Sequence, residues 1–215
     1  MTLNIRKLNA ADIGFSADLK QAIAWDTLAN PEVIKSVSTI LAEVKTDGDA
    51  AVLKWTKKLD QLDLSSAEEL EIPQERLLES LASIPSEQLQ ALEKAAIRIK
   101  QYHEKQKQGS WQYTDADGSS YGQKVTALDR VGIYIPGGKA SYPSTVLMDA
   151  IPAKVAGVGE VIAMVPTPNG EANELVLAAL ALAEVDRVFT VGGAQAIAAL
   201  AYGTNTIPAV GKIVG

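Results

Sequence analysis

The feature that most constrains this chain is the alternation, from residue 130 onward, of short apolar runs with helical stretches. This alternation is typical of parallel βαβ units, in which a helix crosses back over the sheet after each strand. The predicted strands are residues 131–135, 161–165, 188–191 and 212–214, and the predicted helices are residues 144–157, 173–184 and 194–202. Pro152 should kink the first of these helices or divide it in two. We expect residues 129–215 to form a Rossmann-like parallel domain that is truncated, because its fourth strand has only begun where the chain stops.

The preceding residues, 16–128, predict a helix-rich α/β region that forms part of a first domain. Its strongest local signal is Asn30-Pro31-Glu32, which combines an N-cap, a proline at the first helical position and an acid in the first turn. The expected elements are helices at 16–25, from 31 to the break at 47–49, and at 50–59, a strand at 70–72, a long helix capped by Ser86, and a hairpin of strands 111–114 and 120–126. Residues 1–15 have weak periodicity and are interpreted as an N-terminal arm or a frayed tail.

Composition and charge narrow the classes of partner. The 215 residues carry a net charge of −6, which repels phosphate backbones and anionic lipid, so neither nucleic acid nor a membrane is expected as a partner. The chain has no cysteine, which excludes disulfides and thiolate metal sites within these residues. Residues 1–7 lack the pattern of a secretion signal, and the apolar segments are interrupted well short of a membrane span. We expect a globular protein of the cytoplasm.

Two glycine pairs follow predicted strands and are the candidate ligand-binding turns. Pro136-Gly137-Gly138 follows the first strand of the parallel domain, and Gly192-Gly193 follows the third. Both turns should open on the carboxyl edge of the sheet, where doubly wound folds bind ligands. Their glycines would let the backbone approach an anion or a dinucleotide. The residues alone leave a second interpretation open, in which the glycines only make tight turns, since neither segment matches G-x-G-x-x-G.

Two polar side chains lie beside these turns. Tyr134 is on the first strand, two residues before the Pro-Gly-Gly turn, so its ring could line the crevice and present a hydroxyl, although a strand tyrosine is more often plain packing. Gln195 begins a helix beside Gly192 and Gly193, so its amide could bind a ligand's polar groups or could only satisfy backbone donors. Its position favours the ligand.

No pattern of residues supplies catalytic or metal chemistry. His103, the only histidine, lies on the apolar stripe of the long helix after Ser86, so we interpret it as a partly buried core residue. Asp115, Asp117 and Asp129 cluster near the predicted hairpin, but their spacing fits no calcium loop, and turn chemistry explains them. We therefore assign no catalytic residue and no metal ligand.

Several linked segments closely resemble the histidinol dehydrogenase family. They are RVGIYIPGG at 130–138, YPSTVLM at 142–148, IPAKVAG at 151–157 and GGAQAIAALAYGT at 192–204. The likeness is densest from residue 130 to 215 and continues more weakly through Asp47-Gly48-Asp49 and the helix ending in Tyr102-His103.

The resemblance implies an enzyme that oxidises L-histidinol to L-histidine through histidinaldehyde, the last step of histidine biosynthesis. It implies NAD as the oxidant, used twice in turn, and a zinc ion that holds the substrate. The residues that it implies around NAD are Tyr134 and Gln195 as contacts, and Pro136, Gly137, Gly192 and Gly193 as the walls of the pocket. These positions also lie beside the predicted carboxyl edge of the sheet.

Family members are much longer than this chain. After a segment like the one at 212–215 they continue with Pro-Gly-Asn, whose asparagine also binds NAD. Their general-base pair of Glu and His, and their zinc ligands of Gln, Asp and a pair of His, lie further on and cannot be assigned here. We therefore expect these residues alone to bind no catalytic zinc and not to oxidise histidinol. The resemblance also implies an intertwined homodimer, so we expect exposed apolar surface that makes the chain self-associate.

The residues leave two other interpretations to compare with this one. A short homologue could bind a nucleotide without chemistry, but a chain that stops inside a predicted strand leaves a ragged sheet edge, which a selected domain usually avoids. A relative of aldehyde dehydrogenases would need a cysteine nucleophile outside these residues, and the Pro-Gly-Gly and Gly-Gly-Ala-Gln segments favour histidinol dehydrogenase instead.

Overall fold

The computed structural model describes residues 7–23, 30–137 and 142–215, which fall into two compact units, 1–38 and 39–215. The first unit holds α1 (Phe15–Ile23), which matches the helix expected at 16–25 as far as the described residues extend, and the start of α2 (Pro31–Asp47). The side-chain oxygen of Asn30 accepts the Glu32 backbone N–H at 2.9 Å, which confirms the predicted N-cap. The predicted domain boundary near residue 128 stays a prediction.

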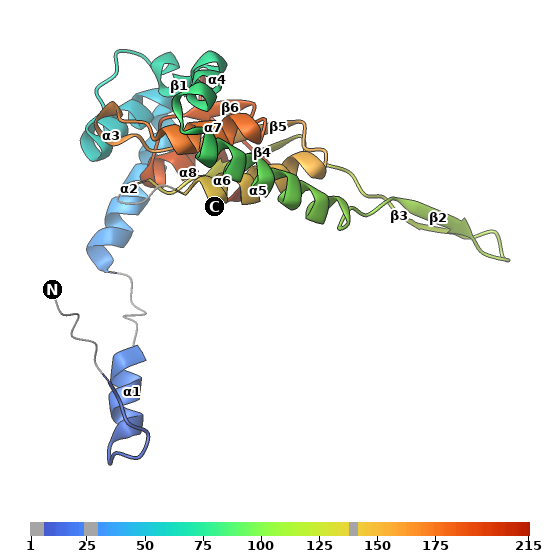
Figure 1. The fold of residues 1–215 in the computed structure, drawn as a ribbon, viewed down its shortest axis with the longest axis horizontal. Coiled ribbons are helices and arrows are strands. Elements are labelled where there is room, and N and C mark those ends of the chain that lie inside the picture. The colour runs from blue at the N-terminus through green and yellow to red at the C-terminus, as the bar shows by residue number, and fades with distance from the viewer. Residues whose placement is uncertain (1–6, 24–29, 138–141) are drawn as a thin grey trace. The chain divides into compact units, whose positions relative to one another are not determined.

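The second unit contains a five-stranded sheet in the order β1-β6-β5-β4-β7. Its strands are β1 (Glu71–Ile72), β4 (Arg130–Tyr134), β5 (Glu160–Met164), β6 (Arg187–Phe189) and β7 (Lys212–Val214). Strand β1 pairs antiparallel with β6, and the other pairs are parallel. The predicted α/β class with a parallel sheet is therefore confirmed (Figure 1). The chain moves outward from β4 to β6 and then returns to the other side of β4, so the order reverses between β4 and β7.

Helices cover both faces of the sheet. On one face lie α4 (Gln74–Ser83), α5 (Ser86–Glu104), α6 (Pro143–Val155) and α7 (Glu174–Leu182), whose apolar side chains share a cluster with β4, β5 and β6. On the other face α3 (Asp49–Asp60), α8 (Gly193–Tyr202) and the end of α2 pack on the alternate residues of β5 and β6. Successive side chains of a strand point to opposite faces of the sheet, so neighbouring residues of β5 and β6 belong to different apolar clusters.

Three helices differ from the sequence expectations. Helix α4 was not predicted. The N-cap position of α5 is Pro85, without a side-chain cap, so the predicted capping by Ser86 is wrong. Helix α6 runs uninterrupted past Pro152, so it is not divided in two. The break between α2 and α3 at Gly48, where φ is +56°, follows the predicted break at 47–49.

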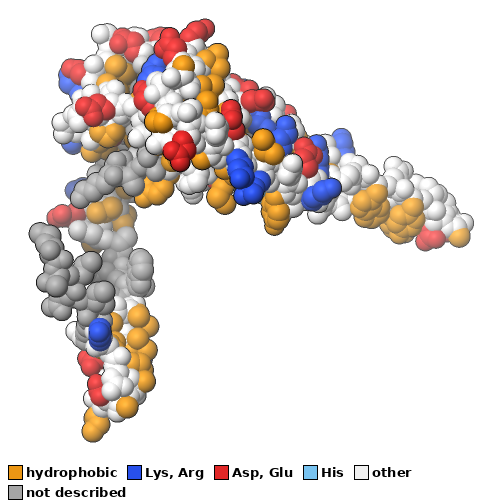
Figure 2. Space-filling model, viewed as in Figure 1, with side chains coloured by type: hydrophobic (Ala, Val, Ile, Leu, Met, Phe, Trp, Pro, Cys, Tyr) orange, Lys and Arg blue, Asp and Glu red, His pale blue; other side chains and the backbone are white. Residues whose placement is uncertain are grey.

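The hairpin of β2 (Trp111–Thr114) and β3 (Ser120–Gln123) forms a separate two-stranded sheet. Its turn places Gly118 at φ +88°, as the predicted turn residues allow, although β3 ends earlier than the predicted residue 126. Every residue of β2 and β3 is exposed, and the rings of Trp111, Tyr113 and Tyr121 stack along the hairpin. Hydrophobic side chains are visible on its surface in Figure 2.

Among the described residues, no helix combines the length and apolar character needed to cross a membrane.

Candidate functional site

The two glycine turns meet at one edge of the sheet, on either side of the loop that follows β5. Gly137 follows β4, Gly192 follows β6, and β5 lies between these strands. A Cβ atom added to either glycine would lie 2.9 Å from the Cβ of Pro166, closer than real side chains pack. The turns therefore converge on Pro166 at the carboxyl edge, and only glycine fits at either position. Gly138 lies outside the described residues.

Tyr134 joins the two turns. Its hydroxyl accepts a hydrogen bond from the Gly193 backbone N–H at 3.1 Å, and its half-buried ring packs against the cluster on the α8 side of the sheet. This hydrogen bond links the end of β4 to the start of α8. The hydroxyl can still donate its own proton. Pro136 and Gly137, beside it, are exposed. The predicted polar residue of the first turn thus lies within reach of the second.

Gln195 lies beneath the second turn. Its side chain is fully buried, and neither the oxygen nor the nitrogen of its amide has a hydrogen-bond partner among the described residues. A Cβ atom on Gly193, whose φ is +58°, would lie 2.8 Å from the amide oxygen, so the amide faces this turn. Burying a polar group without a partner costs about 1–3 kcal/mol. The amide is thus placed to bond to a group that the described residues do not supply.

Asp60, at the end of α3, is a site residue that sequence reasoning missed. Burial raises the pKa of its carboxyl, and a hydrogen bond from the Gly192 backbone N–H works in the opposite direction. Its Oδ2 atom is buried without a hydrogen-bond partner among the described residues. No local pattern marks Asp60, because it reaches the glycine turn only through the packing of α3 against α8.

Two buried threonines complete the edge. Thr167, after β5, and Thr190, after β6, are hydrogen-bonded to each other through their hydroxyls. The site therefore offers hydroxyl, amide and carboxylate groups around backbone that a ligand can approach closely. The part of the chain described by the structure has no group of three or more His, Cys, Asp or Glu side chains that could hold a metal. His103 lies on α5, half-buried, with its Nδ1 atom 2.6 Å from the side-chain oxygen of Gln106.

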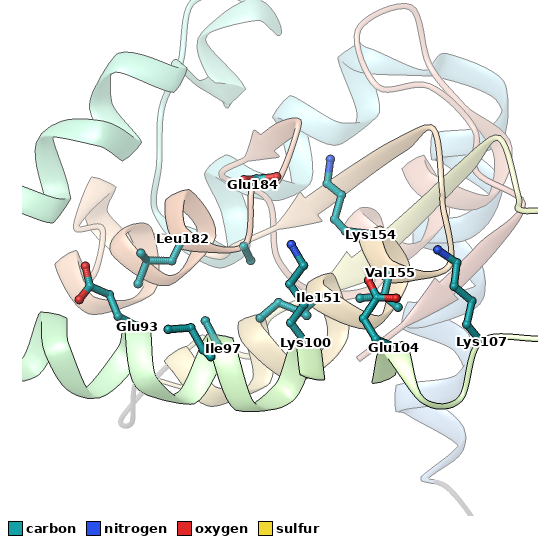
Figure 3. A pocket seen from close by; sticks show the side chains of 12 residues that line it. Glu93, Ile97, Lys100, Glu104, Lys107, Ile151, Lys154, Val155, Leu182 and Glu184 are labelled. Carbon is teal, nitrogen blue, oxygen red and sulfur yellow. The ribbon is translucent and has the colours of Figure 1, made fainter. Parts of the chain in front are cut away.

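A groove elsewhere in the same unit has a volume of about 600 Å³ (Figure 3). It is lined by α5 and by the C-terminal ends of α6 and α7, including Ile97, Ile151 and Lys154. Because α6 runs from the carboxyl edge of the sheet back to the start of β5, this groove lies at the opposite edge from the glycine turns. The ammonium of Lys154 is already paired with Asp186 at 2.6 Å. We therefore place the candidate site at the glycine turns and not in the groove.

Comparison with known proteins supports the resemblance seen in the sequence. A family model described as "Histidinol dehydrogenase" matches residues 25–215. The chain belongs to the histidinol dehydrogenase family.

Several histidinol dehydrogenases align over nearly the whole chain. Those of Pseudomonas fluorescens (strain Pf0-1) and Pseudomonas aeruginosa are each 58% identical over 211 residues, which cover 98% of this chain and 48% of the relative. The crystal structure of histidinol dehydrogenase from Elizabethkingia anophelis matches with a TM-score of 0.81 and 30% identity, over 93% of this chain and 46% of that one. The chain thus spans about half the length of the histidinol dehydrogenases that it matches.

Proposed function

We propose that this chain carries the NAD-binding crevice of a histidinol dehydrogenase, a cytoplasmic and homodimeric enzyme that oxidises L-histidinol to L-histidine through histidinaldehyde. One observation carries the proposal: Tyr134, Gln195 and both glycine turns converge at the carboxyl edge of the sheet. Doubly wound folds bind dinucleotides at this edge, where the strand order reverses. In this chain the order reverses beside β4, the strand that carries Tyr134.

The described residues fit NAD. Gly137 and Gly192 leave backbone that a nucleotide can approach, with Pro136 beside them as the exposed wall. The Tyr134 hydroxyl can donate to a ligand oxygen while it accepts from Gly193. The Gln195 amide, which no described residue hydrogen-bonds, can both donate and accept. When bound, NAD supplies the hydride acceptor. The role of these residues is to bind and orient it.

The described residues do not fit the zinc ion that the family implies, since they bring together no metal-ligating cluster. They also place no general base beside the glycine turns other than the half-buried Asp60. We therefore propose that these 215 residues alone bind nucleotide without oxidising histidinol. The same set of groups, suited to binding and not to chemistry, also fits a non-catalytic nucleotide-binding module as the alternative function.

Calorimetric titration of NAD into the purified chain tests the proposal. Tyr134→Phe removes the hydroxyl that bridges the turns and should weaken NAD binding about three- to tenfold, the value of one hydrogen bond. Gln195→Ala should weaken it at least as much. Tyr202→Phe, at the other end of α8, and Gln101→Ala, at an exposed position of α5, are matched controls that should leave binding unchanged.

The outcomes separate the alternatives. Saturable binding that only the two site variants weaken would support a cofactor crevice in these residues. Binding with no oxidation of histidinol fits both the enzyme half and the binding module, and restoration of turnover by the remaining half of a close relative would decide for the enzyme. Absence of NAD binding, or equal effects of site and control variants, would reject the crevice.

A further inference from the structure

The carboxylate of Asp60 lies where a helix N-terminus normally receives an anion. The first backbone N–H groups of α8 face the site, and the positive end of a helix dipole favours negative charge there. In this chain the Gly192 N–H bonds to Asp60, and a Cβ atom on Gly192 would lie 3.3 Å from the Asp60 Oδ1 atom. The anion position at this turn is therefore held by the protein's own carboxylate. A phosphate group would meet a like charge.

Two unpartnered groups at the same turn indicate that a hydrogen-bonding ligand is expected there. The Oδ2 atom of Asp60 is buried and has no hydrogen-bond partner among residues 7–23, 30–137 and 142–215. The same is true of the oxygen and the nitrogen of the fully buried Gln195 amide. A carboxylate oxygen accepts hydrogen bonds, and an uncharged hydroxyl is a donor that brings no repelling charge. Gly193, at the same turn, is exposed and has φ +58°.

Asp60 lies beside the turn after β6, the strand next to the one whose end binds the adenosine ribose in doubly wound domains. In doubly wound domains the diphosphate lies at the first strand-to-helix turn, and an acid that follows the second strand binds the adenosine ribose. The equivalent second strand is β5, and the residues that follow it are Val165, Pro166 and Thr167, with no acid among them. Asp60 comes to the same edge from α3, beside the turn after β6.

We propose that Asp60 is the residue that makes this site specific for NAD over NADP. Its carboxylate accepts the 2′-hydroxyl of the adenosine ribose, and its charge repels the 2′-phosphate that NADP carries at that oxygen. The proposal rests on the proposed function, because it assumes that the crevice binds a dinucleotide.

The test compares NAD and NADP in titrations of the wild-type chain, Asp60→Asn and Asp63→Asn. Asp63 is an exposed acid that is ion-paired with Lys57. Asp63→Asn therefore removes the same charge close to the end of α3 but away from the turn. Wild type should bind NAD at least about tenfold more tightly than NADP, as expected for a hydrogen bond to a charged group. Asp60→Asn should weaken NAD and strengthen NADP, so that the ratio falls about tenfold or more. Asp63→Asn should keep the wild-type ratio.

A second measurement needs no variant and therefore holds even if Asp60→Asn fails to fold. NAD that lacks the 2′-hydroxyl of its adenosine ribose should bind the wild-type chain about tenfold more weakly than NAD. Equal affinity for the two, or an NAD-to-NADP ratio that Asp60→Asn leaves unchanged, would overturn the role of Asp60 while the crevice stands. If the wild-type chain binds no NAD, both proposals fall.

Discussion

At the scale of single residues, the buried amide of Gln195 lowers the stability of the fold but is well placed to bind NAD. This amide has no hydrogen-bond partner in the part of the chain that the structure describes, so replacing Gln195 by a side chain of similar size without an amide should relieve that cost. We expect Gln195→Met to raise the free energy of unfolding by about 1–3 kcal/mol while NAD binding is lost. Urea denaturation and calorimetric titration of the same preparation would check this. A variant that is both less stable and still able to bind would show that the amide is satisfied and has no role in the site.

Asp149, on α6, gives a prediction for pH dependence. Burial raises the pKa of its carboxyl, so the folded state favours the protonated form, and its contribution to stability is lost as pH rises through the folded pKa. Asp149→Asn imitates the protonated form. It should stabilise the chain near pH 7, by less than about 1 kcal/mol because solvent still screens the partly exposed group.

The difference between Asp149→Asn and wild type should vanish below the ordinary Asp pKa of about 3.9. Thermal denaturation across this pH range is the measurement, with Asp63→Asn as the exposed, ion-paired control. A gain that does not change with pH would contradict the assignment to the carboxyl charge.

The sequence indicated some site residues and not others for a physical reason. Tyr134 and Gln195 lie within a few positions of glycine turns that follow predicted strands, so their neighbourhood could be inferred along the chain. Asp60 has no such neighbour, because its contact with Gly192 exists only once α3 has packed on α8. The unpartnered state of the Gln195 amide is also a property of packing, which no local pattern encodes.

At the scale of elements, the close contact of α8 with β4 explains a glycine inside a strand. A Cβ atom on Gly132 would lie 2.7 Å from the Cδ1 atom of Leu200, whose fully buried side chain has no room to yield. Gly132→Ala should therefore lower the free energy of unfolding by about 1–3 kcal/mol through overpacking. Denaturant titration measures this change in the free energy of unfolding. Gly109→Ala, where nothing lies within 4 Å of the added atom, is the control, and an equal loss in both would exclude the contact as the cause.

Periodicity predicted the elements whose buried faces are broad. All four parallel strands appear within one or two residues of their expected ranges. Strands β4, β5 and β6 are mostly buried beyond their charged first residue, whereas β7 is mostly exposed and was predicted from the βαβ alternation that precedes it. Helix α4 was missed because its buried stripe is thin: Leu77 is fully buried, whereas Leu78 is 61% exposed. Distant contacts also hold α4 in place: the Gln74 side chain donates to the backbone oxygens of Val185 and Asp186, and Arg76 pairs with Glu174.

At the scale of the whole chain, apolar side chains remain exposed in both units. In the first unit they are Ile13, Leu19, Ile23, Val33, Ile34 and Val37. In the second they include the stacked rings of Trp111, Tyr113 and Tyr121, on a hairpin with no buried residue. A two-stranded hairpin is only marginally stable unless something packs on it. These surfaces agree with the expectation of self-association, which stays a prediction.

We expect the chain to form dimers or larger species that dissociate on dilution, measured by light scattering over a range of concentrations. Trp111→Ser combined with Tyr121→Ser should shift this equilibrium toward the monomer, because it removes apolar area from the hairpin. Tyr102→Ser, which removes an exposed aromatic ring from α5, is the matched control. A monomer at high concentration, or an equal shift by the control, would exclude association through the hairpin.

The strand order has a consequence for how the molecule folds. Strands β4, β5 and β6 are consecutive in the chain and adjacent in the sheet, whereas β1 must be brought from residue 71 to the far side of β6. Pairing over short loops is faster than pairing that closes long ones. In pulse-labelled hydrogen exchange we therefore expect the amides of β5 to be protected before those of β1. Both glycine turns follow strands that pair early, whereas Asp60 reaches its turn only when α3 packs on α8. The crevice would therefore form before the residue that makes it selective is in place.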